Sequence, residues 1–541
     1  MRRCKFVSKI ALFILSCLVF MTACSPFDKV ISIFKDDGSN YIFKISISDD
    51  PENLDPQIAS DISSVMIAKN MFVGLLRLDE NGRISSGVAK DYTISSDGLK
   101  YVFNLDDRYR WTTSADFEAD VTANDFVFAF KRLFNPETGS EYADEYFCIK
   151  GSKQAYEGTA SLDDIGVKAL DDYTLEITLE YPNARFLSLL TALPASPCNE
   201  EFFNLCRGKY GLEADAIASN GPFYVTYWLH DEYGKNNYVR IRRCSAYSEI
   251  STVTAAGVNY LVEKDKSVRL SDFTGGSTNV YIPDDPSVSE LAEYNSIAVY
   301  TGSAGLIVNP SNEVFSRPEV LDILSMCISR SELETAAGFK AAYGVIPDAA
   351  FVGGTRYRGG ANEPEIEENS MLAEYKWAFT LTDDEKLSIN GCTIMVPDSF
   401  LEYNLLSSVT DMWYDALGLT VNIEVVNQSD YERRLENGDY DICLMIVESQ
   451  TLDAYDYIFS FSSDEGAVFD EACKKAYDSR DKYTTLTEAI YDISLAESSL
   501  VDNNKFIPLW YLPKFIYCDD DTSEITYDPF TGAIMFEKAV H

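Results

Sequence analysis

Histidine is almost missing from this chain of 541 residues. Its two histidines, His230 and His541, supply no histidine-rich metal site and little material for histidine-based catalysis. Basic residues are also scarce, because 45 Lys and Arg stand against 86 Asp and Glu, which gives a net charge of -41. That deficit argues against a nucleic-acid partner, since phosphate binding needs clustered Lys and Arg. We interpret the charge as a solvated acidic surface, with a cationic ligand as the alternative.

The sequence signatures of common enzyme classes are missing too. Neither G-x-S-x-G, H-E-x-x-H, G-x-x-x-x-G-K-[ST] nor G-x-G-x-x-G occurs. His230 beside Asp231 is an isolated pair on an expected loop, which is typical of a surface histidine. Carboxylate pairs are abundant, so a glycosidase dyad stays open by count, but no sequence context singles one out. We therefore predict a protein that is not an enzyme and has no cofactor or metal, with a secreted carboxylate-dependent hydrolase as a distant alternative.

No two of the 12 cysteines form a C-x-x-C pair, so a zinc or thioredoxin-like site has no support. Nine cysteines lie beyond the N-terminal segment: Cys148, Cys198, Cys206, Cys244, Cys327, Cys392, Cys443, Cys473 and Cys518. Nine is odd, so they cannot all pair with one another. Cys198 and Cys206 could pair locally, but we predict scattered, buried and reduced thiols.

The N-terminal segment has the pattern of a targeting signal. Four basic residues precede an apolar run of 11 residues from Ile10 to Phe20, which is too short for a membrane span but suits a signal peptide. Small residues directly before Cys24 resemble a bacterial lipobox. We predict a signal peptide over residues 1–23, lipid attachment at Cys24 and a tether over residues 24–40, which would anchor the protein to a membrane. The alternative is an ordinary secretory signal with a chance cysteine.

The remaining chain mixes strand and helix patterns without a fixed-period repeat. Residues 41–47 alternate as a strand does, and residues 61–78 carry apolar side chains at helical spacing. Thr122 and Asp125 form a capping-box pattern, and Pro318 stands where the first turn of a helix tolerates proline. In the last third helices alternate with strands, as in a parallel sheet. The chain is thus predicted to be α/β or α+β.

Short motifs follow one another in a characteristic order over about residues 41–512. They include Leu54-Asp55-Pro56, Gly74-Leu75-Leu76, Ser96-Asp97-Gly98, Thr122-Ala123-Asn124-Asp125-Phe126, Lys131-Arg132, Ser219-Asn220-Gly221-Pro222-Phe223-Tyr224, Phe315-Ser316-Arg317-Pro318, Gly438-Asp439-Tyr440-Asp441 and Ile507-Pro508-Leu509. Together they resemble the bacterial extracellular solute-binding proteins of family 5, the large peptide-binding type that serves ABC importers.

The resemblance implies an α/β fold of the periplasmic-binding-protein-like type II, with two lobes, a hinge, and an extra domain inserted in the N-terminal lobe. Three names follow from that layout. Lobe I is residues 37–85, 209–303 and 510–541; domain II is residues 86–208; lobe III is residues 304–509. The ligand would be buried between the lobes of a monomer.

The resemblance also implies a function, namely capture of peptides in the interlobe cleft and their delivery to an ABC permease in the membrane. Backbone hydrogen bonds would hold an extended peptide without reading its side chains, and closure of the lobes would exclude water. The protein would be extracytoplasmic and lipid-anchored to the bacterial cell membrane. The alternative is the same scaffold binding a non-peptide solute, such as a sugar or a metal chelate, or a signalling peptide.

Peptide importers of this family grip the ligand's α-ammonium group with a cleft aspartate near a tryptophan. By position, Gln450 stands where that aspartate is expected and Val447 where the tryptophan is expected. A neutral amide holds an ammonium less well than a carboxylate does. Glu448 lies two residues earlier on the same strand face and could substitute for the aspartate. The alternative for Glu448 is an exposed carboxylate at the rim of the cleft.

Five more positions are expected at the ligand through the resemblance. Ser60 and Asp61 follow the first strand, although Asp61 could equally be a helix N-cap. Asn220 is either a cleft contact or a structural turn residue. Asn309 lies at the end of the cleft-facing strand. Tyr431 either packs on a ligand side chain or belongs to the core face of a helix.

Overall fold

The computed structural model describes residues 40–79, 83–115, 117–231, 236–283, 291–400, 403–449, 452–463, 466–480, 482–528 and 531–541. Residues 1–39 and Gln450 lie outside the described residues. The signal peptide (1–23), lipid attachment at Cys24, the tether that follows it and the role of Gln450 therefore stay predictions. Over the described ranges, no helix combines the length and the apolar character needed to cross a membrane.

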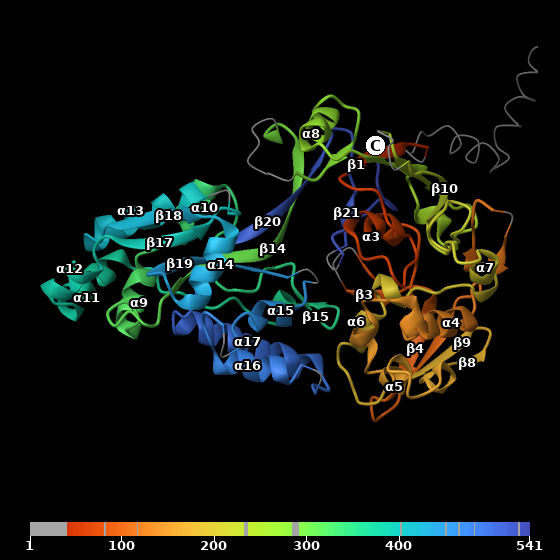
Figure 1. Cartoon of the computed structure of the whole chain (residues 1–541), viewed down its shortest axis with the longest axis horizontal. Coiled ribbons are helices and arrows are strands. Elements are labelled where there is room, and N and C mark those ends of the chain that lie inside the picture. The colour runs from red at the N-terminus through yellow and green to blue at the C-terminus, as the bar shows by residue number, and fades with distance from the viewer. Residues whose placement is uncertain are drawn as a thin grey trace, which may run out of the picture.

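One mixed sheet of ten strands runs through both lobes (Figure 1). Its strand order is β10-β11-β12-β1-β13-β20-β14-β19-β17-β18. The strands are β1 (Ile42–Ile47), β10 (Phe223–Leu229), β11 (Tyr238–Arg243), β12 (Gly257–Val262), β13 (Val280–Tyr281), β14 (Asn295–Val308), β17 (Cys392–Pro397), β18 (Val421–Val426), β19 (Ile442–Glu448) and β20 (Ile507–Cys518). The predicted first strand is thus confirmed as β1.

The two longest strands, β14 and β20, connect the lobes. They pair antiparallel from Asn295 opposite Cys518 to Leu306 opposite Ile507. One end of this ribbon joins β13 of lobe I, and the other end joins β19 of lobe III (Figure 1). The pairing register shifts between Tyr300 and Gly302 and again after Ala304. Because bulges bend and twist a ribbon, these two shifts lie where the relative orientation of the lobes is set.

In lobe I the helix predicted over residues 61–78 is wrong in its length. Helix α3 (Ile62–Lys69) ends early, and the chain continues to β2 (Leu76–Leu78), which pairs with β3 (Ile84–Ser86). The side chain of Asn70 stops the helix, because it donates to Met66 O and Ile534 O and accepts from Phe536 N. The remaining elements of lobe I are α8 (Lys266–Thr274), β21 (Thr526–Tyr527) and β22 (Ile534–Met535).

Domain II has its own antiparallel sheet in the order β4 (Ala89–Ile94), β5 (Lys100–Leu105), β9 (Thr174–Thr178) and β8 (Val167–Asp171). Helix α4 (Ala123–Leu133) begins with the predicted capping box of Thr122 and Asp125, which is confirmed. Burial raises the pKa of Asp125 to about 6, although the Thr122 N–H and the Trp111 indole donate to its carboxylate. The other elements are β6 (Arg110–Trp111), β7 (Ala119–Asp120), α5 (Ser152–Tyr156), α6 (Phe186–Leu189) and α7 (Glu200–Leu205).

Lobe III is the α/β unit expected from the last third of the sequence. Strand β17 pairs parallel with both β18 and β19, which confirms the predicted parallel arrangement. Pro318 occupies the first turn of its helix, as predicted. The elements around the sheet are α9 (Pro318–Met326), α10 (Arg330–Ala337), β15 (Phe351–Val352), β16 (Thr355–Arg356), α11 (Ser370–Thr380), α12 (Asp383–Ile389), α13 (Leu406–Leu417), α14 (Gln428–Asn437), α15 (Ala454–Phe459), α16 (Glu471–Asp478) and α17 (Leu486–Asp502).

The nine cysteines from Cys148 to Cys518 are free, and eight of them are buried. This confirms the prediction of scattered, reduced thiols, and the local pair of Cys198 with Cys206 does not form. Burial raises the pKa of the Cys198 thiol to about 12. Such thiols are protonated at neutral pH and therefore poor nucleophiles.

Candidate functional site

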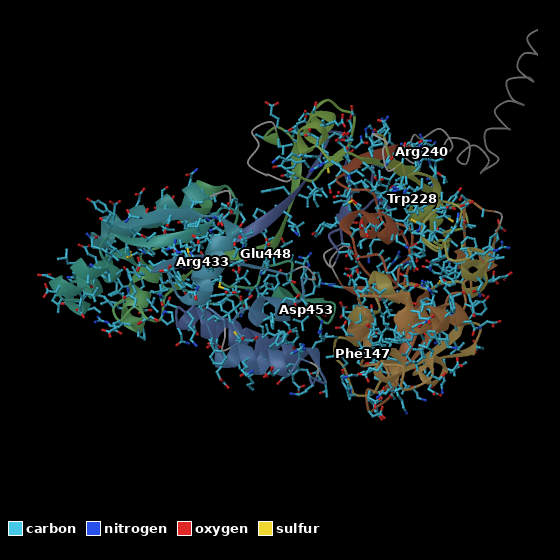
Figure 2. All side chains as sticks on the ribbon, in the orientation of Figure 1. Phe147, Trp228, Arg240, Arg433, Glu448 and Asp453 are labelled. Atoms are coloured by element: carbon cyan, nitrogen blue, oxygen red, sulfur yellow. The ribbon has the colours of Figure 1, made fainter. Side chains whose placement is uncertain are left out.

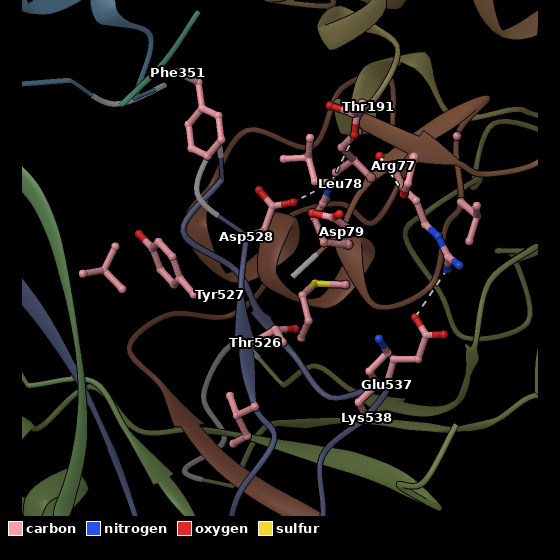
Figure 3. Close-up of a pocket in the computed structure, with 18 of the residues that line it drawn as sticks. Arg77, Leu78, Asp79, Thr191, Phe351, Thr526, Tyr527, Asp528, Glu537 and Lys538 are labelled. Atoms are coloured by element: carbon pink, nitrogen blue, oxygen red, sulfur yellow. Dashed lines mark hydrogen bonds and ion pairs between the residues drawn. The ribbon is translucent and has the colours of Figure 1, made fainter. Parts of the chain in front are cut away.

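A cavity of about 700 Å³ opens where the two lobes and domain II meet (Figure 3). Its size falls in the range of about 300–1,000 Å³ that is typical of small-ligand sites. Four parts of the chain supply most of the lining: residues within 69–79 and within 525–528 and 535–538 of lobe I, Ile297–Tyr300 of β14, and residues within 348–356 of lobe III. Thr191, Leu193 and Ser196 of domain II add to it. The cavity is therefore an interlobe cleft that reaches the hinge ribbon.

Asn220 fixes one wall of this cleft from behind. Its side chain is 1% exposed; it accepts from Val73 N at 3.0 Å and donates to Val73 O at 2.7 Å. The following Gly221 has no room for a side chain, because a Cβ there would stand 2.5 Å from Met71 O. Val73 and Pro222 line the cleft, whereas Asn220 does not. The Ser-Asn-Gly-Pro motif thus holds the wall in place.

A buried ion pair ties lobe I to domain II beside the cleft. The guanidinium of Arg132 on α4 pairs with both oxygens of Asp55, and the Arg132 Nη1 to Asp55 Oδ1 distance is 3.0 Å. Burial opposes the charge of Arg132, but attraction to Asp55 outweighs it and raises the pKa of Arg132. Arg132 also donates to Gln57, whose amide donates to Pro194 O and Ser196 O. The motifs Leu54-Asp55-Pro56 and Lys131-Arg132 are therefore joined by this ion pair.

Lys69 and Asp528 form an ion pair on the lobe I wall of the cleft. Lys69 Nζ lies 2.8 Å from Asp528 Oδ2 and also donates to Thr191 O of domain II at 3.3 Å. Burial alone would raise the pKa of Asp528. Attraction to Lys69 and hydrogen bonds from Lys69 and Thr531 outweigh that effect and hold the pKa below its ordinary value. Asp528 is therefore charged at neutral pH.

Arg77 brings a second group of charges to the same wall. It pairs with Glu249, lies 3.7 Å from a carboxylate oxygen of Glu537, and donates to the Tyr247 hydroxyl at 3.2 Å. Figure 3 shows Arg77 and Glu537 at one end of the drawn lining, with Tyr527 and Asp528 toward the other end, nearer Phe351 of lobe III. The walls therefore offer both signs of charge.

Aromatic rings complete the lining. Phe351 of lobe III and Tyr527 of lobe I both line the cleft, and the guanidinium of Arg356 stacks 6.0 Å from the centre of the Phe351 ring. Burial raises the pKa of Tyr527 to about 12, so its hydroxyl keeps its proton and can donate a hydrogen bond. A ligand with polar groups and at least one apolar side chain matches this mixture.

Several residues expected at the ligand do not line this cavity. Ser60 is exposed, and Asp61 caps α3 by accepting from Ser64 N at 2.8 Å. Asn309 donates to Gly438 O and Tyr440 O and so fixes the end of β14. Tyr431 is buried in the lobe III core and donates to Leu444 O at 2.9 Å. Each of these side chains except Ser60 has a structural partner, and their roles at a ligand stay predictions.

Glu448 lies at the exposed end of β19, opposite Gly302 of β14. A Cβ at Gly302 would stand 2.9 Å from Glu448 Cγ, so glycine leaves room for this side chain. Figure 2 shows Glu448 and Asp453 on the side of lobe III that faces lobe I and domain II. Burial is the largest cause that raises the pKa of Tyr457. The charges of Asp456, Glu448, Tyr527 and Asp453 raise it further. Glu448 therefore belongs with Asp453 and Asp456 to an acidic group around Tyr457, and it does not line the cavity itself.

Sequence reasoning missed Lys69, Arg77, Asp528 and Glu537. The two acids belong to the C-terminal segment, which reaches the cleft only because β20 returns the chain to lobe I. No local pattern distinguishes them among 86 acidic residues. Only a contact between residues far apart in the sequence could have identified them.

Comparisons with known proteins agree with this architecture. The family model described as bacterial extracellular solute-binding proteins, family 5 Middle, matches residues 83–468. The oligopeptide-binding protein OppA of Bacillus subtilis is 24% identical over 537 residues, which cover 93% of each chain. The dipeptide-binding protein DppE of the same species is 27% identical over 303 residues, 55% of this chain and 53% of that protein.

Among solved structures, the murein tripeptide binding protein MppA in its unliganded open form has a TM-score of 0.72 at 20% identity and covers 93% of this chain and 97% of its own. The predicted two-lobe type II fold is thus confirmed, and the family consists of substrate-binding proteins, not enzymes. The chain belongs to family 5 of the bacterial extracellular solute-binding proteins.

Proposed function

We propose that this protein captures peptides in the interlobe cleft and delivers them to an ABC permease in the bacterial membrane. The observation that carries the proposal is the cleft itself, which has about 700 Å³ of space at a two-strand hinge and walls with paired charges and aromatic rings. A peptide has a charged group at each end, a polar backbone and apolar side chains. It therefore matches the Lys69–Asp528 pair, the Arg77 group and the Phe351 wall together.

The mechanism we propose is closure of lobe III onto lobe I and domain II, with the three parts divided at the boundaries expected from the sequence. The register shifts in the β14–β20 ribbon are the places where bending disturbs the fewest ladder hydrogen bonds. Closure would remove water from the paired charges and so strengthen their contacts with the ligand. The fold's likeness to the unliganded open form of MppA supports an open cleft in the present structure.

Glu448 is our candidate partner for the ligand's α-ammonium group. It is exposed, its charge acts on Tyr457 together with those of Asp453 and Asp456, and a carboxylate binds an ammonium more strongly than the amide of Gln450 would. Gln450 in place of the expected aspartate also motivates the alternative, in which the same scaffold binds a sugar, a metal chelate or a signalling peptide.

Native mass spectrometry of protein purified without denaturation tests the ligand class. We expect mass adducts of peptide size, which disappear after unfolding and refolding. Returning the identified peptide at 100 times its dissociation constant should then stabilise the protein by about 2.7 kcal/mol. A sugar or chelate adduct would overturn the peptide proposal, and release of a chemically altered ligand would overturn the binding role.

Membrane attachment is a separate part of the proposal. We propose that residues 1–23 are removed and that Cys24 carries the lipid, which places the protein on the outer side of the cell membrane. Metabolic labelling with an alkyne-bearing fatty acid should mark the wild type and not a Cys24→Ser variant. Equal labelling of both would rule out this anchor.

A further inference from the structure

Domain II touches lobe III away from the hinge ribbon, across the cleft from β14 and β20. Arg185, the N-cap residue of α6 in domain II, forms an ion pair with Asp453, the N-cap residue of α15 in lobe III. The two side chains are 25% and 11% exposed. Figure 1 shows α15 and β15 on the side of lobe III toward α6 and β3. The partly buried pair thus bridges two parts of the protein that the cleft would otherwise separate.

Close packing surrounds this bridge. Gly353 and Gly354 form the turn between β15 and β16 with positive φ angles of 54° and 74°. A Cβ at Gly353 would stand 3.0 Å from Ala184 O, and one at Gly354 would stand 2.6 Å from Ile84 Cδ1. The turn of lobe III therefore fits against domain II and β3 without space for a side chain.

Arg185 determines whether the electrostatic interaction between domain II and lobe III at this contact is attractive or repulsive. Glu145 of domain II lies near Arg185, Asp453 and Asp456, and burial raises the pKa of both Glu145 and Asp453. Asp456 accepts a hydrogen bond from Ser449 at 2.7 Å. With the guanidinium present, opposite charges face each other across the contact. Without it, Glu145 of domain II would face two carboxylates of lobe III, and like charges repel.

The bridge is connected to the cleft wall through the backbone. Asp453 caps α15 by accepting from Tyr455 N at 3.1 Å, and the preceding Leu452 O accepts from Phe351 N at 2.8 Å. Phe351 and Arg356 of the same hairpin line the cleft. A residue that fixes Asp453 therefore also fixes the aromatic part of the lobe III wall.

We propose that Arg185 is a positioning residue that clasps lobe III to domain II, limits how far the empty cleft opens, and holds the Phe351 wall in place. An empty cleft that opens less has less distance to close, so less of the ligand's binding free energy goes into the movement. The clasp rests on the two-lobe arrangement and does not depend on which ligand binds.

The test measures the interlobe distance in ligand-free protein. Fluorophores on unnatural amino acids at Leu170 of domain II and Tyr414 of lobe III, which are 56% and 60% exposed, report it by single-molecule energy transfer. For Arg185→Glu and the milder Arg185→Gln we expect the low-transfer, wide-open population to grow about threefold or more, the size expected for losing a partly buried ion pair. Arg185→Lys keeps the positive charge and should change the wide-open population least.

Arg110→Glu is the matched control, because Arg110 pairs with Asp120 at 3.0 Å and donates to Asp107 O and Tyr109 O, all within domain II. It should leave the distance distribution unchanged. Raising NaCl from 50 mM to 500 mM should enlarge the wide-open population of the wild type, since salt screens the attraction. In Arg185→Gln only like charges remain, so the same increase should not enlarge that population. Circular dichroism and thermal unfolding confirm that each variant is folded. A wild-type distribution in both Arg185→Gln and Arg185→Glu would overturn the clasp, as would the same salt-induced widening in Arg185→Gln as in the wild type.

Discussion

Replacing Asp55 by alanine should destabilise the protein more than almost any other single charge removal, because it leaves the guanidinium of Arg132 buried without its carboxylate. The side chains of Arg132 and Asp55 are only 8% and 2% exposed, so the guanidinium would stay largely shielded from solvent after the carboxylate is removed. Breaking a buried pair by removing one partner costs about 3–5 kcal/mol. Gln57 would keep one hydrogen bond to Arg132, so we expect the lower half of that range.

Urea unfolding at pH 7, followed by tryptophan fluorescence, to which the buried Trp111 of domain II contributes, measures this loss. The double variant Asp55→Ala/Arg132→Met should recover most of it, because a buried ion pair can be replaced by apolar side chains at little cost. The matched control is Asp163→Ala. Asp163 is exposed and pairs with the neighbouring Lys131, so its removal should leave the unfolding midpoint nearly unchanged.

Two results would refute the reasoning. One is a loss below about 1 kcal/mol for Asp55→Ala, which would mean that Arg132 finds water or another partner at no cost. The other is a double variant as unstable as the sum of the single variants Asp55→Ala and Arg132→Met, since additivity would show that the two residues do not depend on each other.

Three further predictions concern other sites. Burial raises the pKa of Asp125 to about 6, so Asp125 binds a proton more tightly in the folded chain than in the unfolded chain. The free energy of unfolding should therefore fall by about 3 kcal/mol as pH rises from about 4 to above 6. Urea titrations of Asp125→Asn should lack this pH dependence. Asn220→Ala leaves the N–H and C=O of Val73 without partners and should cost about 2–4 kcal/mol in urea unfolding; a loss under about 0.5 kcal/mol contradicts its wall-holding role. Glu448→Gln should weaken binding of a peptide with a free N-terminus about tenfold in calorimetry and leave the affinity for an N-acetylated peptide unchanged. If the wild type and Glu448→Gln bind the peptide with the free N-terminus equally well, Glu448 does not belong to the site.

Elements whose signals are local could be predicted from the sequence. The alternation of residues 41–47, the capping box at Thr122 and Asp125, and the proline at position 318 each depend on neighbours within a few residues, and each prediction is confirmed. The stretch after Lys69 could not be predicted in this way. Its apolar residues are buried by contacts with domain II and β22, and periodicity alone cannot distinguish such burial from a longer helix.

The candidate site was harder to predict than the fold. Asn220 and Asp61 were expected at the ligand. Instead, the Asn220 side chain forms hydrogen bonds with the backbone of Val73 in the cleft wall, and the Asp61 side chain accepts from the backbone N–H of Ser64 in α3. A position that matches a family motif can therefore mark the frame of a site instead of its surface. Lys69 and Asp528 line the cleft but are 459 positions apart by their numbers, so no window along the sequence contains both.

The order of strands in the large sheet has a consequence for biogenesis. β1, near the start of the described chain, is flanked by β12 and β13, and the ring of Tyr41 stacks 3.5 Å from the ring of His541. Residues 304–509 are one continuous stretch and can begin to fold while they emerge, whereas the sheet around β1 has to wait for β20, which begins 460 residues after the end of β1. A nascent chain of this kind stays incomplete in lobe I, and open to proteases and chaperones, until β20 has appeared.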